Sequence, residues 1–223
     1  VTTTGTLSVA TSFAWSAGFL IGGNGGALVL AHTATGTITG GTPHTDALLV
    51  NHGTLTFPTG FSWSGSGTLD NRGTFELAGG YSVRTLNSGT LRKTGTGTAT
   101  LGSALTSTGT IDVQAGTLLL NGSANSIGGT STVSAGATLR FGNASTHQAG
   151  GTIAGAGTLS LTGGTQTLAG DVTWPVATVA MAGATVVTSP GSATVAGAFA
   201  WSAGFLIGGN GGALVLDDTA AGS

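Results

Sequence analysis

The stretch Asn71-Arg-Gly-Thr-Phe-Glu-Leu77 (NRGTFEL) carries the pattern on which the fold depends. Its opening Asn-x-Gly-Thr recurs as NHGT at Asn51–Thr54 and as NSGT at Asn87–Thr90, and STGT at Ser107–Thr110 is a close variant. The starts of these four segments are nearly evenly spaced along the chain, and an apolar residue follows each of them. A unit of about 20 residues, made of short strands and glycine turns, has the size of one coil of a β-solenoid.

Alternation within NRGTFEL divides its side chains into an interior and an exterior set. Successive side chains of a strand point to opposite faces, so Phe75 and Leu77 lie on one side and Thr74 and Glu76 on the other. Stacked coils bring equivalent positions to about 4.8 Å from each other. The register therefore predicts an interior column of Leu55, Phe75, Leu91 and Ile111, and an exterior column of Thr54, Thr74, Thr90 and Thr110.

A second interior column follows from the same register. It contains Phe57, Leu77 and Val113, and Lys93 interrupts it, so we expect a local bulge at the lysine. Two polar columns are also predicted: an amide ladder of Asn51, Asn71 and Asn87, and an outward charge ladder of Glu76, Arg92 and Asp112. Stacked amides can satisfy backbone groups of the turn that leads into the strand. Alternating charges on neighbouring strands are favourable.

A longer repeat spans the chain. The segment FAWSAGFLIGGNGGALVL at Phe13–Leu30 recurs unchanged at Phe199–Leu216. Sliding the chain by the same offset aligns Val1–Thr37 with Val187–Ser223, and 26 of the 37 positions are identical. Such identity indicates a tandem array, because unrelated loops do not repeat in this way.

We therefore interpret residues 1–223 as one continuous β-solenoid, in which 1–186 is a long tandem repeat and 187–223 is the start of the next copy. At about 20 residues per coil the long repeat holds roughly nine coils. The second copy should then superpose on the first after a translation, with Trp201 in the environment of Trp15.

Composition excludes several classes of function. The chain has 43 glycines, no cysteine, five Lys and Arg, seven Asp and Glu, and a net charge of −2. So few cations cannot neutralise a row of phosphates, which argues against nucleic acid as a partner. No apolar run reaches the length of a membrane helix, so we expect no membrane insertion. Without cysteine, zinc-finger, iron–sulfur and thiol chemistry are excluded, and we expect no cofactor.

Aromatic pairs separated by two positions mark the long repeat. The pairs are Phe13/Trp15, Phe61/Trp63 and Phe199/Trp201, with a weaker Val172/Trp174. With the Asn-x-Gly-Thr segments, they resemble the repetitive passenger regions of giant bacterial surface proteins, the autotransporter and filamentous-haemagglutinin-like adhesins. That resemblance implies a right-handed parallel β-helix at the bacterial cell surface or outside the cell. We expect Trp15, Trp63 and Trp201 to form an interior aromatic stack rather than sugar-binding platforms.

Catalytic and metal sites are weakly supported by the sequence. Asp70 beside Arg72 and near Glu76 is the best corner for a polysaccharide-active enzyme, and a solvated surface pair explains it equally well. His32 and His52 can stack on adjacent coils, but a metal site needs more ligands. The glycine-rich GGNGG at residues 22–26 lacks the lysine of a phosphate loop and the aspartate of a calcium repeat. We expect neither catalysis nor a bound metal.

The sequence thus favours a structural role. We expect a shaft of an extracellular filament or surface adhesin that grows by head-to-tail self-association or by continuation of the same chain. The alternative is an adhesin face that binds a surface glycan or a host protein, with Leu168–Pro190 as a loop because it lacks the repeat pattern. An ice-binding solenoid is a further alternative, but it requires a flat, charge-free double rank of threonines, and the register supplies a single column.

Overall fold

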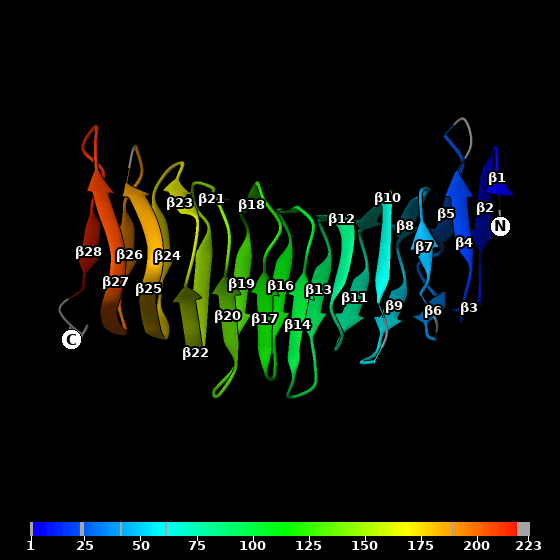
Figure 1. Cartoon of the computed structure of the whole chain (residues 1–223), viewed down its shortest axis with the longest axis horizontal. Helices are drawn as coiled ribbons and strands as arrows, with labels where there is room; N and C mark the ends of the chain where they lie inside the picture. Colours follow the sequence, from blue (N-terminus) through cyan, green and yellow to red (C-terminus); the bar gives the residue numbers. More distant parts are fainter. Residues whose placement is uncertain (1, 23–24, 41, 61, 189, 218–223) are drawn as a thin grey trace.

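The chain forms a stack of parallel β-strands that winds through about ten turns without a helix among the described residues. The structure is a computed structural model that describes residues 2–22, 25–40, 42–60, 62–188 and 190–217. Turns follow each other along one axis, with the first and last coils at opposite ends (Figure 1). The all-β solenoid predicted from the sequence is confirmed, with equivalent strands about 20 residues apart.

Each turn contributes strands to three faces, and the strands of the interior turns pair in parallel with their equivalents in the turns before and after. Face 1 contains β3 (Ser12–Trp15), β6 (Thr35–Ile38), β9 (Thr54–Phe57), β11 (Thr74–Leu77), β13 (Thr90–Lys93), β16 (Thr110–Val113), β19 (Thr130–Val133), the start of β22 (Thr152–Leu161), β24 (Val172–Trp174), β26 (Ala193–Val195) and β28 (Leu214–Leu216).

Face 2 contains β1 (Thr2–Thr3), β4 (Phe19–Gly22), β7 (His44–Thr45), the starts of β10 (Trp63–Asn71) and β12 (Tyr81–Asn87), β14 (Thr98–Leu101), β17 (Thr117–Leu120), β20 (Thr138–Phe141), the end of β22, and the starts of β25 (Val176–Thr188) and β27 (Ala198–Gly208). Face 3 contains β2 (Thr6–Val9), β5 (Ala27–Leu30), β8 (Leu48–Asn51), the ends of β10 and β12, β15 (Leu105–Ser107), β18 (Asn125–Ile127), β21 (Ser145–His147), β23 (Thr165–Leu168), and the ends of β25 and β27.

The glycine of Asn-x-Gly-Thr is required by the close stacking of the turns between faces 3 and 1. A Cβ atom at Gly73 would lie 2.2 Å from the carbonyl oxygen of Gly53, and one at Gly89 would lie 2.1 Å from that of Gly73. Any side chain there would clash with the backbone of the turn below. Glycine therefore permits the coils to approach at the strand spacing, which is why it recurs with the coil period.

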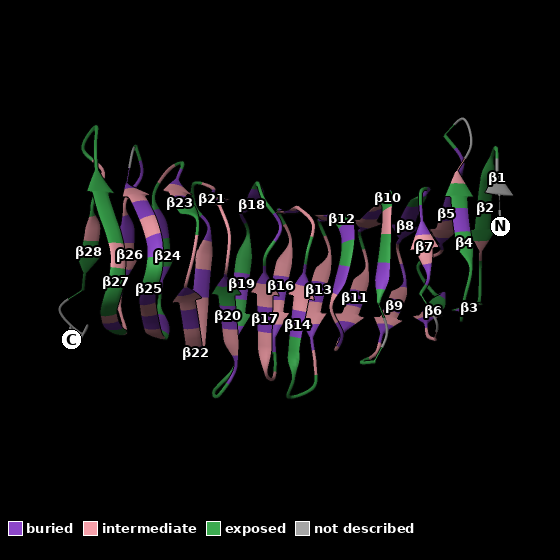
Figure 2. Ribbon diagram, in the orientation of Figure 1, coloured by how far each residue is buried: buried purple, intermediate pink, exposed green. Residues whose placement is uncertain are grey.

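The interior is filled by apolar columns that run along the axis, visible as the buried positions that alternate within the strands (Figure 2). Leu55, Phe75, Leu91 and Ile111 pair in register on face 1 and are fully buried. The threonines beside them remain partly exposed. The strand alternation in NRGTFEL therefore separates interior from exterior as the pattern predicts.

The expected bulge at Lys93 is wrong. Lys93 pairs in register with Leu77 and Val113, and its side chain is fully buried. Its Nζ atom donates hydrogen bonds to the backbone oxygens of Thr94, Gly95 and Ala115. The lysine stays in the interior column because three carbonyls at the following corner accept its three donors. Desolvation lowers its pKa.

The expected loop at Leu168–Pro190 is also wrong. This region forms β24 and the 13-residue β25, which runs across faces 2 and 3. It lacks Asn-x-Gly-Thr, yet its valine, alanine and threonine residues alternate between buried and less buried positions. β-branched residues favour strands, and Gly183, with φ of 125°, turns the corner between the two faces.

The two copies of the repeated segment do not occupy equivalent positions, so the expected superposition is wrong. Phe13 pairs with Gly36 on face 1, whereas Phe199 pairs with Val179 on face 2. The later strands of the segment are displaced likewise: Ala27–Leu30 lies on face 3, and its counterpart β28 lies on face 1. Every strand of the second copy therefore stands one face further around the coil.

Candidate interaction surfaces

A ladder of buried asparagines joins neighbouring coils at the corner between faces 3 and 1. Nδ2 of Asn51 donates to Oδ1 of Asn71 at 2.7 Å, and Nδ2 of Asn71 donates to Oδ1 of Asn87 at 2.7 Å. The second hydrogen of each amide reaches the carbonyl of Thr74 or Thr90 at 2.9 Å. The amides thus bond to one another and to the turn backbone, although the buried Oδ1 of Asn51 has no hydrogen-bond partner among the described residues, and their role is to hold the coils in register.

The asparagine ladder ends at Asn87, because the next coil has Ser107 at the equivalent position. Nδ2 of Asn87 donates to Oγ of Ser107 at 3.0 Å. A fourth buried asparagine, Asn125, lies in a different column of face 3, two positions before Ile127, which pairs with Ser107, and donates hydrogen bonds to Gly122 O and Ser145 Oγ. Asn125 is not part of an Asn-x-Gly-Thr segment. The sequence feature that could have indicated its buried position is its spacing of one coil from Leu105 and from Ser145.

Glu76, Arg92 and Asp112 lie on three successive coils of face 1 and form one ion-pair ladder. Arg92 pairs with Glu76 on one side and with Asp112 on the other in the strand register. Its Nε atom donates to Asp112 at 3.0 Å and its Nη1 atom donates to Glu76 at 2.9 Å. Asp112 and then Glu76 raise the pKa of the guanidinium. These side chains are about one-third exposed or less, so the ladder fixes register more than it adds stability.

The exterior threonine column on face 1 is longer than the sequence motif indicates. The strand register aligns nine threonines on consecutive coils: Thr35, Thr54, Thr74, Thr90, Thr110, Thr130, Thr152, Thr173 and Thr194. The parallel column two positions further holds Glu76, Arg92 and Asp112 in its middle. The face therefore carries one uncharged rank beside one charged rank.

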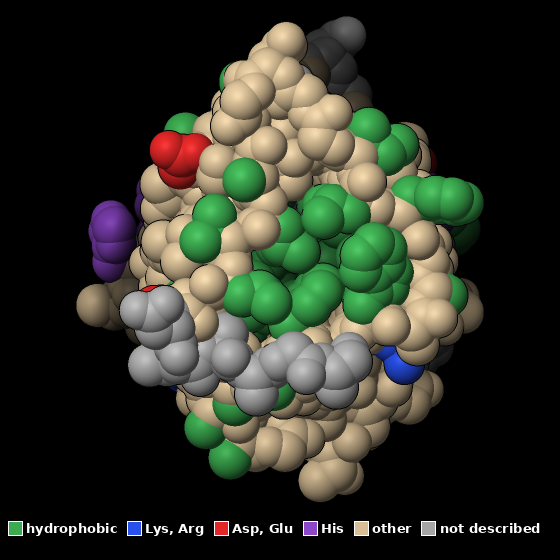
Figure 3. Space-filling model, turned by 90° about the vertical axis from the view of Figure 1, so that its left-hand side faces the viewer, with side chains coloured by type: hydrophobic (Ala, Val, Ile, Leu, Met, Phe, Trp, Pro, Cys, Tyr) green, Lys and Arg blue, Asp and Glu red, His purple; other side chains and the backbone are tan. Residues whose placement is uncertain are grey.

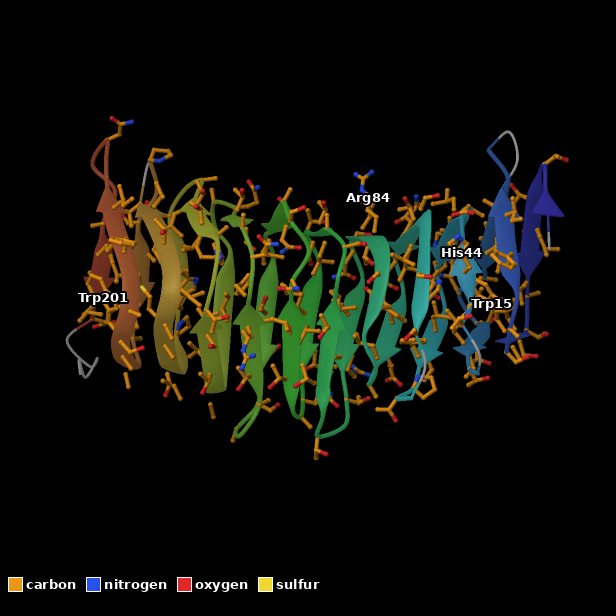
Figure 4. All side chains as sticks on the ribbon, viewed as in Figure 1. Trp15, His44, Arg84 and Trp201 are labelled. Carbon is orange, nitrogen blue, oxygen red and sulfur yellow. The ribbon has the colours of Figure 1, made fainter. Side chains whose placement is uncertain are left out.

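The expected aromatic stack holds for two of its three members. Trp15 and Trp63 are buried, with ring centroids 6.4 Å apart, and Trp63 stacks on Tyr81 at 5.4 Å. Trp201 lies at the opposite end of the coil from Trp15 (Figure 4), and 46% of it is exposed. Its inclusion in the stack is wrong, because the last coil has no described coil above it to cover the ring.

Histidine positions do not converge on a metal site. The rings of His32 and His52 stack with centroids 5.0 Å apart. His44 contacts Asp46 at 3.1 Å, and hydrogen bonds from Ser66 are the main cause that lowers the pKa of Asp46. Within the described ranges no three His, Cys, Asp or Glu side chains are grouped to hold a metal.

One buried histidine was not singled out by the sequence. His147 lies inside face 3 against Phe141 and Trp174, at ring-centroid distances of 5.0 and 5.5 Å. A ring nitrogen lies 3.2 Å from Oε1 of Gln166. Burial lowers its pKa to about 4. In the structure His147 pairs with Ile127 of the preceding coil. Its spacing of one coil from this isoleucine is the sequence feature that could have indicated an interior position.

At the corner considered for catalysis, Asp70 forms an ion pair with Arg72, and Glu76 does not join them. Nη2 of Arg72 donates to Asp70 at 2.7 Å, and Glu76 pairs instead with Arg92. Phe61 and residues 23–24 of the glycine-rich turn lie outside the described residues.

Apolar side chains reach the surface at both ends of the coil. At the C-terminal end, Trp201, Leu206 and Leu216 are 46%, 37% and 44% exposed, and hydrophobic side chains gather at the centre of this end (Figure 3). At the N-terminal end, a hollow of about 310 Å³ is lined by residues that include Leu7, Trp15 and Gly18.

Comparisons with family models, curated proteins and solved structures find no match to this chain. In the described part of the chain there is no helix of the length and apolarity that a membrane crossing requires.

Proposed function

We propose that this protein is a structural shaft of a bacterial extracellular filament or surface adhesin, extended by axial stacking of β-solenoid repeats. The observation that carries the proposal is the unbroken parallel pairing of about ten turns on all three faces. Each interior coil satisfies its backbone groups through the coils on either side. Stability then grows with the number of coils and needs neither metals nor disulfides.

The chemistry of the surface supports a mechanical role. Each carboxylate between residues 46 and 171 has a partner. The carboxylates of Asp70, Glu76 and Asp112 form ion pairs with arginine. Those of Asp46 and Asp171 accept hydrogen bonds from neighbouring residues. Such groups fix one coil against the next. Scarce charge reduces colloidal solubility, which a protein that associates can tolerate.

Two other functions remain as alternatives. A ligand-binding adhesin face would use an exterior site, and a polar hollow of about 230 Å³ near Asp171, Ser192 and Thr194 is the best place for a sugar or a protein loop. Ice binding is favoured by the nine-threonine column and opposed by the ion pairs beside it. A flat double rank without charge is absent from face 1 over these coils.

A binding and digestion experiment separates the shaft from the adhesin face. The purified chain is incubated with proteases and, separately, with an array of surface glycans. A shaft resists digestion, because its backbone is paired throughout, and it binds no glycan specifically. Saturable binding of one glycan that is lost on changing Asp171→Ala would contradict the proposal and assign the polar hollow to that sugar.

A further inference from the structure

We propose that Ser64, His44 and Asp46 form a nucleophilic site on the exterior of face 2 that hydrolyses activated esters, with Ser64 as the nucleophile and His44 as the general base. The activity is additional to the proposed structural role, and either can fail without the other. A nucleophile, a base and a carboxylate that orients the base lie in one chain of contacts, which is the arrangement that this chemistry needs.

The coil period brings the three side chains together from two neighbouring turns. His44 lies on β7 (Figure 4) and pairs with Ser64 at the start of β10, 20 positions later in the chain. The alternate positions, Thr45 and Trp63, are buried. Strand alternation therefore points His44 and Ser64 outward together, and Asp46, two positions after His44, is exposed on the same side.

A glycine after the serine permits the two turns to approach closely. Gly65 has φ of 139°, and a Cβ atom there would overlap the carbonyl oxygen of Thr45. The corner that follows brings Ser66 into contact with Asp46. Any residue other than glycine would push this corner away from the coil that holds His44 and Asp46.

Asp46 is held in place by the neighbouring coil. The backbone N–H and the hydroxyl of Ser66 donate to its Oδ1 atom at 3.0 and 2.8 Å. These hydrogen bonds are the main cause that lowers the pKa of Asp46, so the carboxyl group stays ionised. Nε2 of His44 lies 3.1 Å from the same oxygen. Because a carboxylate only accepts, Nε2 carries the hydrogen of this contact and Nδ1 keeps its lone pair.

The second ring nitrogen faces the serine. Nδ1 of His44 lies 3.4 Å from Oγ of Ser64. The contact between a nucleophile and its base is often this loose without substrate and tightens when the substrate binds. The Ser64 side chain is exposed, so an ester in solution reaches its hydroxyl. Asp46 thus orients the base, and the base is placed to take the proton of Ser64.

The reaction is an acyl transfer followed by hydrolysis. Oγ of Ser64 bonds to the ester carbonyl carbon while its proton passes to Nδ1 of His44. The bond to the leaving oxygen then breaks, and that oxygen receives the proton from His44. Water next gives a proton to His44 and bonds to the acyl carbon. Ser64 departs with that proton, which leaves a free acid and the original site.

The openness of the site selects the class of ester. The side chains of His44 and Asp46 are 33% and 37% exposed. An open site stabilises a developing oxyanion weakly, so the ester needs a leaving group that departs easily. The ring of Phe19 lies against His44, with ring centroids 5.3 Å apart, and offers an aromatic surface beside the base. Aryl esters meet both conditions, because they release a phenolate and carry a ring that packs on Phe19.

The test measures turnover and covalent labelling on the full chain. Release of nitrophenolate from p-nitrophenyl acetate gives the rate, and a fluorophosphonate probe followed by peptide mass spectrometry locates the nucleophile. The probe should attach to Ser64, and Ser64→Ala and His44→Ala should each reduce the rate by about 100-fold. The matched control is His52→Ala, which removes a surface histidine outside the cluster and should leave the rate unchanged.

The positioning role of Asp46 has its own readout. Asp46→Asn should lower kcat and leave KM unchanged, because the amide no longer selects the ring tautomer that presents Nδ1 to Ser64. Asp46→Glu should restore part of kcat. A role in folding alone would not separate kcat from KM in this way.

Circular dichroism checks that every variant keeps its β structure. A folded chain in which the probe does not label Ser64, or hydrolysis that survives Ser64→Ala, would overturn the inference. Hydrolysis that is kept in Ser64→Ala and lost in His44→Ala would assign the reaction to the imidazole alone. A native chain that is labelled at Ser64 but is readily digested by proteases would refute the shaft and leave this site standing.

Discussion

The identical segments Phe13–Leu30 and Phe199–Leu216 turn at the same glycines, yet they stand on different faces, and the separate strands β3 and β4 of the first copy correspond to the single strand β27 of the second. Gly18 and Gly204 turn the corner after the tryptophan in both copies, with φ of 92° and 106°. Burial of the identical side chains differs: Trp15 is 7% exposed and Trp201 46%. Local sequence thus determines where the chain turns, and the neighbouring coils determine which face the strands join, where they end and what they bury.

The displacement follows from the unequal lengths of the coils. The coil that separates the paired residues Trp15 and Ile38 is longer than the one that separates Asn71 from Asn87. Nine turns along the column of Phe13 lead to Val195, whereas the sequence repeat places the second copy of this phenylalanine at Phe199. The repeat is therefore slightly longer than nine turns, and the surplus carries the second copy onto the next face.

The largest expected effect is the difference in stability between substitutions of the last leucine in each copy. Leu30 is fully buried and Leu216 is 44% exposed. Leu30→Asp places an unpaired charge in the interior and should cost about 3–5 kcal/mol of unfolding free energy. Leu216→Asp should cost less than about 1 kcal/mol. Denaturant unfolding at low protein concentration measures both. Equal losses would show that the two copies share one environment.

The two tryptophans provide a smaller contrast. Trp15→Ala removes a ring packed against Trp63 and Phe13 and should cost about 3–4 kcal/mol, whereas Trp201→Ala should cost about 1 kcal/mol. In dilute solution acrylamide should quench the fluorescence of Trp201 more strongly than that of Trp15, as single-tryptophan variants can show. Equal quenching would remove the difference in burial on which the comparison depends.

The interior of the turns between the two copies contains His147, and its burial can be tested through the pH dependence of the unfolding free energy. Burial lowers its pKa to about 4 from 6.5, so the unfolded chain binds this proton more readily than the folded one. The unfolding free energy should therefore be highest above pH 6.5 and fall by roughly 3 kcal/mol as the pH drops toward 4. His147→Leu should flatten this slope. An unchanged slope in the variant would place the histidine outside the core.

The smallest effect concerns the charge ladder that lies between the two copies. Arg92→Asp loses two partly exposed ion pairs and should lower stability by about 1 kcal/mol or less, with some added repulsion from Glu76 and Asp112. Leu91→Asp, at the preceding position, buries a charge and should be far more damaging. Equal melting temperatures would reverse the inside and outside of face 1.

Sequence alone predicted the periodic parts of this molecule. The Asn-x-Gly-Thr spacing located the amide ladder and the interior column of Phe75, because a coil repeat and strand alternation specify neighbours directly. It did not predict the partners of Lys93, since backbone carbonyls at a corner leave no mark in the pattern. It also missed the changed face of Trp201, because that depends on the summed lengths of nine unequal coils.

The central claim, that the second copy stands one face further around a continuous solenoid, is tested most directly by disulfide formation. The chain has no cysteine, so engineered pairs report without background. Ala180 and Ala200 pair on neighbouring coils of face 2. Their Cα atoms are about 4.8 Å apart by the strand spacing, within the range of a disulfide.

The control pair is Pro175 and Ala200, which should crosslink only if the two copies stand on the same face. If Phe199 occupied the column of Phe13, it would replace Val195 above Trp174, and Ala200 would then lie above Pro175. On mild oxidation, the account predicts a rapid and complete disulfide in the Ala180→Cys/Ala200→Cys variant and none in the Pro175→Cys/Ala200→Cys variant. The reverse result would contradict it.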